Sequence, residues 1–218
     1  NVTPPAGFLQ AVQEIAKENG ALLIADEMQT GFGRTGLMWG CDHDAVVPDV
    51  MTVGKGIGGG FPMSALISTD ELTSRKPFAN PSGSSSSFGG NPLAAAAGLA
   101  ALEIILKDDL VNNARRVGAV MLTRLRAMQE RYRCIGDVRG RGLLLGLDLV
   151  RDRTSKERLP KEVTQALFQE CVRRGLIAMC YGPVVRICPP LIISEEKALE
   201  GLAILDDALA MVTRKYHL

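Results

Sequence analysis

The chain has 218 residues, of which 25 are basic, 24 are acidic and 46% are hydrophobic, a globular composition that excludes wholesale disorder. The formal net charge of +1 leaves no excess of positive charge for neutralising phosphates, which argues against a nucleic-acid-binding protein. The apolar runs are shorter than the ~20 residues that a membrane span needs, so we expect no membrane insertion.

In its first part the chain alternates between helical and strand patterns. A helical repeat of apolar residues ends at Gly20. The apolar run that follows ends abruptly at Asp26 and is typical of a buried parallel strand. The alternation predicts an α/β architecture. The expected elements are a helix over 6–19, strands over 21–25, 50–53 and 64–68, and a helix over 92–106.

The second part has the pattern of a small α+β domain. Ser194 is a suitable N-cap for its last helix, because acidic residues follow in the first turn. The expected elements are helices over 109–131 and 160–174, strands over 143–150, 176–180 and 184–188, and a final helix after 194.

The cysteines do not suggest a metal site or a disulfide framework. They are five in number, irregularly spaced and without a CxxC pair, and the two histidines lie far apart. We interpret them as buried free thiols of a reducing compartment. This interpretation favours the cytoplasm, or the mitochondrial matrix for a chain that has lost a targeting segment.

Three residues stand out for their chemistry. Asp26 follows a strand at its carboxyl end, where ligands bind in α/β sheets. Lys55 follows a strand and lies between glycines, as suits a lysine for Schiff-base chemistry. Arg186 lies inside an apolar run and requires a carboxylate, either an internal one or that of a substrate. The ordinary alternatives are a turn-capping Asp, a solvated Lys and an internal salt bridge. No Ser or Thr follows Lys55, so the glycines there are not a nucleotide P-loop.

Six blocks of sequence together resemble the class III aminotransferases, which are pyridoxal 5'-phosphate (PLP) enzymes of fold type I. The six blocks occur in the same order as in that family and at similar spacings, and they cover essentially the whole chain. The blocks are residues 24–36, 48–50, 54–62, 88–94, 136–142 and 186–191.

The resemblance implies a role for each of five residues. Lys55 would form the internal aldimine, a Schiff base with PLP, and Asp26 would pair with the pyridine nitrogen. Gln29 would donate a hydrogen bond to the phenolic oxygen of the ring, and Arg186 would bind the substrate carboxylate. Ser87 stands where the family usually has Thr, and would reach the phosphate of the cofactor in the neighbouring subunit. The resemblance thus implies a homodimer with a shared site.

The resemblance also implies the reaction and the domain organisation. The reaction is transfer of an amino group from an amino acid or ω-amine to a 2-oxo acid. Residues 1–105 correspond to the C-terminal part of the PLP-binding large domain, and 106–218 to the C-terminal small domain. The family's chain is about twice as long, so we expect a fragment without the N-terminal half and its principal phosphate-binding turn. Such a fragment would be weakly active or inactive alone.

Other functions stay open at this point. Residues 134–150 resemble dialkylglycine decarboxylase, which favours decarboxylation-dependent transamination. Racemisation, a 1,2-amino shift or phospho-lyase chemistry can also occur at the same cofactor in this family. A function of another class would be that of a catalytically inert, truncated chain with a structural or assembly role. Met179, Cys180 and Tyr181 are candidates for the donor pocket near Arg186.

Overall fold

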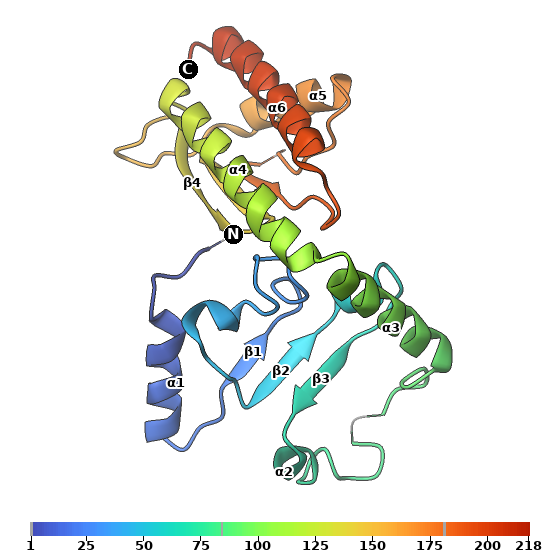
Figure 1. Cartoon of the computed structure of the whole chain (residues 1–218). Coiled ribbons are helices and arrows are strands. Elements are labelled where there is room, and N and C mark those ends of the chain that lie inside the picture. Colours follow the sequence, from blue (N-terminus) through green and yellow to red (C-terminus); the bar gives the residue numbers. More distant parts are fainter. Residues whose placement is uncertain (1, 84, 181) are drawn as a thin grey trace. The chain divides into compact units, whose positions relative to one another are not determined.

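The computed structural model describes residues 2–83, 85–180 and 182–218, and the chain divides into two compact units. Residues 4–111 form one unit, and residues 112–218 form the other together with the first residues of the chain. Each unit contains a three-stranded sheet of its own (Figure 1).

In the 4–111 unit, β1 and β2 run parallel, and β3 pairs with β2 in the antiparallel direction. The helices and strands predicted for this part are confirmed, with small differences at their ends. The elements are α1 (Phe8–Glu18), β1 (Ile24–Asp26), the 3-10 helix η1 (Cys41–Asp44), β2 (Val50–Val53), the 3-10 helix η2 (Lys55–Gly58), β3 (Ala65–Ser68), α2 (Asp70–Thr73) and α3 (Pro92–Lys107).

The prediction that the first strand is buried is wrong for this chain. Ile24 is 60% exposed and Leu22, just before the strand, is 55% exposed. An apolar run predicts a strand, but burial also requires a second layer that packs on it. The nearest helix in sequence, α1, has no buried residue and does not supply that layer.

In the 112–218 unit, three long helices and an antiparallel sheet, in the order β4-β5-β6, surround one hydrophobic core (Figure 1). The last two helices each bury an apolar face in that core. The elements are α4 (Leu110–Arg131), β4 (Ile135–Arg141), β5 (Leu144–Leu149), α5 (Lys161–Arg173), β6 (Val184–Ile187) and α6 (Glu195–Tyr216).

Two strands of this unit differ from the prediction. The expected strand over 176–180 is reduced to one bridge, in which the Arg186 amide donates to the Met179 carbonyl at 3.1 Å. Conversely, β4 was not predicted, because Gly136 and Gly140 interrupt its apolar alternation. In the described part of the chain, no helix is both long enough and apolar enough to cross a membrane.

Candidate active site

Asp26 and Lys55 lie at one edge of the first sheet. Asp26 is the last residue of β1 and pairs with Thr52 of β2 in the parallel register. Lys55 follows the end of β2, after Gly54. Because parallel strands end at the same edge, the structure brings these two predicted residues to the place where α/β sheets bind ligands.

The Asp26 carboxylate is exposed and has one oxygen engaged. Its Oδ1 accepts from the Met28 amide at 3.1 Å and from the Thr52 hydroxyl at 3.2 Å. Among the described residues, none donates to Oδ2. The carboxylate is therefore held at one oxygen and can accept a further hydrogen bond at the other.

Lys55 begins the 3-10 helix η2 in a left-handed conformation, with φ of 45°, and its side chain is exposed. Within residues 2–83, 85–180 and 182–218, its amine has no hydrogen bond or ion pair. A Cβ on the preceding Gly54 would collide with the Met28 sulfur. A glycine at this position therefore lets the turn after β1 lie directly against the end of β2.

The loop that follows β1 contains Gln29 and a residue that the sequence reasoning missed. Gln29 is exposed in the turn after Asp26. Glu27 is buried, and its carboxylate accepts from the amides of Gly40 and Cys41, each at 2.8 Å. Burial, together with the Glu27 carboxylate, raises the pKa of the Cys41 thiol to about 12, so the thiol is neutral. The sequence offered no signal for Glu27 except its position next to Asp26.

Ser87 lies in an exposed segment just before α3, next to Phe88, which is 83% exposed. Asn91 caps α3 because its side-chain oxygen accepts from the Ala94 amide at 2.9 Å. The Asn91 amide also donates to the Phe88 carbonyl at 3.3 Å. Ser87 thus directly precedes a turn fixed to the helix. Ser84, which belongs to the same serine run, lies outside the described residues.

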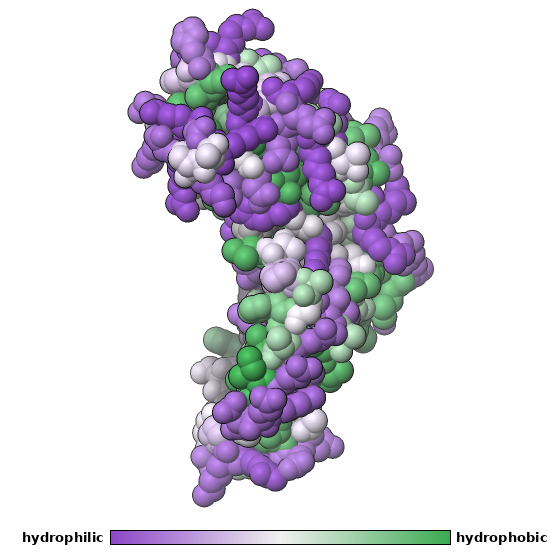
Figure 2. All heavy atoms as spheres, turned by 90° about the vertical axis from the view of Figure 1, so that its left-hand side faces the viewer, coloured by the Kyte–Doolittle hydropathy of each residue, from purple (hydrophilic) through white to green (hydrophobic). Residues whose placement is uncertain are grey.

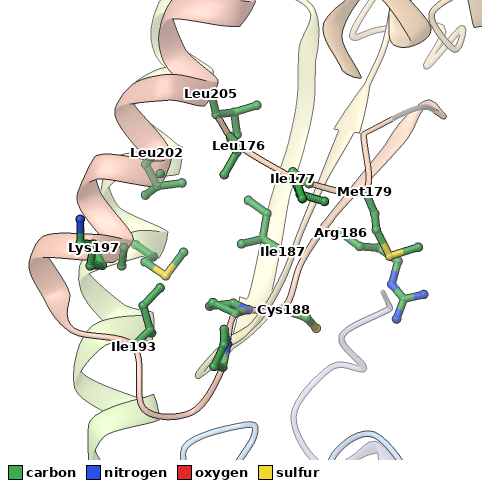
Figure 3. A pocket seen from close by; sticks show the side chains of 16 residues that line it. Leu176, Ile177, Met179, Arg186, Ile187, Cys188, Ile193, Lys197, Leu202 and Leu205 are labelled. Carbon is green, nitrogen blue, oxygen red and sulfur yellow. The ribbon is translucent and has the colours of Figure 1, made fainter. Parts of the chain in front are cut away.

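Arg186 belongs to the other unit, so the structure does not place it relative to Lys55. It lies in β6 opposite Gly146, beside a cavity of about 340 Å³. Figure 3 shows that its guanidinium points away from α6 and lies on the side of the cavity where Met179 is found. Of the three donor-pocket candidates, Met179 lines this cavity, Cys180 is buried and Tyr181 lies outside the described residues. The apolar lining includes Leu176, Ile187, Ile193, Leu202 and Leu205.

Known proteins with sequences similar to this chain include a racemase and several aminotransferases. A leucine/methionine racemase from Thermococcus litoralis is 41% identical over 97% of this chain and 47% of its own length. The human mitochondrial alanine–glyoxylate aminotransferase 2 is 37% identical over 94% of this chain and 40% of its own length. The chain therefore spans about half the length of the curated relatives that it matches.

A comparison with a solved structure shows which fold the chain has. An amine transaminase from an uncultivated Pseudomonas species, described as PLP-bound, superimposes with a TM-score of 0.90 at 33% identity. The match covers 97% of this chain and 49% of that one. The mixed α/β fold is thus that of PLP-dependent transaminases. The family model "Aminotransferase class-III" matches residues 1–209. This chain belongs to the class-III aminotransferases, a PLP-dependent family.

Proposed function

We propose that this chain takes part in the PLP-dependent transfer of an amino group from an amino acid or ω-amine to a 2-oxo acid. Family membership and the aminotransferases among its relatives support this reaction. The observation that carries the proposal is the edge of the first sheet, where Asp26 ends β1 and Lys55 follows the neighbouring parallel strand β2.

The residues at that edge fit the cofactor chemically. Lys55 offers an exposed primary amine, the group that condenses with an aldehyde with loss of one water. Asp26 keeps Oδ2 available to accept from a protonated ring nitrogen, while its bonds to Met28 and Thr52 hold the carboxylate in place. When bound, PLP supplies an electron sink for cleavage of a bond at the substrate Cα.

The other residues have proposed roles around that pair. Lys55 carries a proton to and from the substrate Cα, and Gln29 donates to the phenolic oxygen of the ring. Ser87 binds the phosphate of the cofactor in a neighbouring subunit, which makes the active form a homodimer. Arg186 binds the substrate carboxylate through its planar guanidinium.

The proposed function also implies a domain assignment, a class of substrates and a cellular location. We propose that residues 1–105 are the C-terminal part of the PLP-binding large domain and 106–218 the C-terminal small domain. The substrates are a small amino donor and a 2-oxo acid acceptor. The proposed location is the cytoplasm, with the mitochondrial matrix as the alternative, since the human relative is named mitochondrial.

One specific observation favours a second candidate, amino-acid racemisation. The relative with 41% identity is named a leucine/methionine racemase. Racemisation uses the same lysine and the same cofactor, because it also begins with removal of the proton at Cα. It differs in that no 2-oxo acid is consumed.

A stoichiometric assay tests the proposal and separates the two reactions. The PLP-loaded chain is incubated with a ¹⁵N-labelled amino donor and a 2-oxo acid, and the labelled amino acid product is measured by mass spectrometry. In parallel, L-leucine is incubated without an oxo acid and D-leucine is measured. Lys55→Ala is the test variant, and Lys107→Ala, an exposed lysine of α3, is the matched control.

Because the chain spans about half the length of its relatives, we expect only a small yield of labelled product from the wild type and from Lys107→Ala, and a yield lower by at least roughly tenfold from Lys55→Ala. D-leucine without labelled amino acid would instead establish racemisation. Equal yields of product from Lys55→Ala and the wild type would overturn the proposed role of Lys55. No product from any chain would favour an inert chain with an assembly role.

A further inference from the structure

Glu27 is a buried carboxylate directly after Asp26, behind the proposed cofactor site. The residue is 3% exposed. Its Oε1 accepts from the Cys41 amide at 2.8 Å, and its Oε2 accepts from the Gly40 amide at 2.8 Å and from the Thr30 hydroxyl. A buried carboxylate is costly unless its oxygens accept hydrogen bonds, and here both oxygens do. Glu27 therefore joins the start of the loop that follows β1 to its end.

The backbone of Glu27 continues the sheet. Its amide donates to the Thr52 carbonyl at 2.9 Å, and its carbonyl accepts from the Gly31 amide at 3.0 Å. In an extended chain, successive side chains point to opposite faces. The exposed Asp26 and the buried Glu27 follow that alternation. Glu27 therefore faces the loop, while Asp26 faces the proposed cofactor.

The fit around this carboxylate is close. A Cβ on Gly40 would lie 2.8 Å from the Thr30 Cβ and 3.1 Å from Glu27 Oε2. Only a glycine at this position lets the returning chain approach near enough to donate its amide. The loop and the carboxylate are thus matched in shape as well as in hydrogen bonding.

We propose that Glu27 is a positioning residue, which closes the 27–41 loop and thereby fixes Asp26 and Gln29 beside Lys55. It lies between the first two in sequence and is bonded to the strand that leads to the third. Loss of its carboxylate frees the loop, so that the Asp26 carboxylate and the Gln29 amide no longer keep one orientation. This inference rests on the proposed function.

The test uses two measurements on the whole chain. The first is amide hydrogen exchange at Met28, Gly40 and Cys41 without cofactor, where the Met28 amide reports its bond to Asp26. The second is the yield of PLP fixed to Lys55 by borohydride. The variants are Glu27→Ala, Glu27→Gln, which keeps the side-chain volume, and Thr30→Val, which keeps both backbone bonds to Glu27. Glu71→Gln, at an exposed ion pair with Arg75, is the matched control.

For Glu27→Ala we expect faster exchange at all three amides and a lower Lys55 yield. Each exchange rate and the Lys55 yield should change by roughly tenfold, which corresponds to the loss of one hydrogen bond to a charged group. The exchange rates and the Lys55 yield of Glu27→Gln should lie between those of Glu27→Ala and the wild type. This variant tests the inference if Glu27→Ala does not fold. Thr30→Val changes less, and Glu71→Gln matches the wild type.

The two measurements distinguish a failure of the inference about Glu27 from a failure of the proposed function. If exchange rises at Gly40 and Cys41 but not at Met28, Glu27 only holds the loop, and the inference is overturned. An unchanged Lys55 yield in both Glu27 variants overturns it as well. If PLP is not fixed to Lys55 even in the wild type, the proposed function fails, while the Met28 exchange still decides whether Glu27 positions Asp26.

Discussion

Cys188 differs from the other four cysteines in its surroundings. It is exposed, whereas Cys41, Cys134, Cys171 and Cys180 are all buried. Burial also raises the pKa values of the Cys41 and Cys134 thiols, and only the thiolate is the reactive form. We predict that one thiol of the native chain reacts rapidly with Ellman's reagent, and that Cys188→Ser removes that rapid phase. The total after unfolding is five in the wild type. A rapid phase that persists in Cys188→Ser would contradict the description of the other four.

Asp206 is a second residue whose role depends on its partners. It is 8% exposed and accepts from the Tyr132 hydroxyl at 2.6 Å, from Arg124 at 3.1 Å and from Arg131. Burial acts to raise its pKa, but the hydrogen bonds from Arg131 and Tyr132 outweigh burial and hold the pKa below the ordinary 3.8. The same network, with burial as the largest cause, raises the pKa of Tyr132 to about 12.

The Asp206→Asn variant should therefore be less stable by about 1–3 kcal/mol at neutral pH. Because the pKa of the Asp206 carboxyl is lower in the folded chain than in the unfolded chain, ionised Asp206 stabilises the fold at pH values above its unfolded-state pKa. That stabilisation is lost as the pH falls through the folded-state pKa. The difference in unfolding free energy from the wild type should be constant from about pH 5 to pH 7 and shrink as the pH falls below about 4. Urea unfolding at several pH values measures it. Asp207→Asn, at a side chain that is 71% exposed, is the control. A difference that grows towards acid would contradict the sign.

At the scale of the elements, α6 has an N-cap that the sequence already indicated. The Ser194 Oγ accepts from the Lys197 amide at 3.2 Å, and Glu195 and Glu196 occupy the first turn. We predict that Ser194→Ala costs about 1 kcal/mol of unfolding free energy, and that Ser194→Asp restores most of it. Urea unfolding followed by circular dichroism measures both. Equal stabilities of the Ala and Asp variants would show that the cap contributes nothing.

Elements with a regular apolar period could be predicted from the sequence, and those held by long-range pairing could not. The apolar residues of α6 from Leu202 to Val212 recur with the helical period in the sequence, and they are buried in the core. The expected strand over 176–180 has no periodic apolar pattern of this kind. Whether it pairs with β6 over its full length depends on the path of the chain between them, and only one bridge forms.

The candidate site follows the same rule. The positions of Asp26 and Lys55 at the ends of apolar strands are visible in the sequence, but their roles were predicted from the resemblance to the family. Glu27 was missed because its partners are backbone amides, whose positions depend on how the loop to Gly40 closes. Asp206 was missed for a similar reason, since its partners lie on another helix and in the segment just beyond it.

At the scale of the molecule, the two units bury their apolar residues unequally. The 112–218 unit has one continuous core. In the 4–111 unit, the apolar helix α3 buries only Gly98 and Ile105, and Leu99 and Leu106 are 60% and 59% exposed. Figure 2 shows apolar residues at the surface among hydrophilic ones. Such surfaces bind apolar dyes.

We predict that the native chain enhances the fluorescence of the dye ANS, and that Leu99→Glu with Leu106→Glu lowers this enhancement several-fold. Ala100→Glu, at an exposed position of the same helix, adds one acidic charge without removing a large apolar side chain. It should leave the signal nearly unchanged. A signal as strong in the double variant as in the wild type would place the dye elsewhere.

Lys55 is the residue that we propose bonds to PLP. In the proposed function, the Lys55 amine would condense with the aldehyde of the cofactor and release one water, and borohydride would then reduce the new bond to a stable secondary amine. Peptide mapping of the reduced chain shows which lysine carries the added mass. We predict that the peptide containing Lys55 is modified, and that Lys55→Ala abolishes this modification. Modification of another lysine instead, with the Lys55 peptide unchanged, would contradict it.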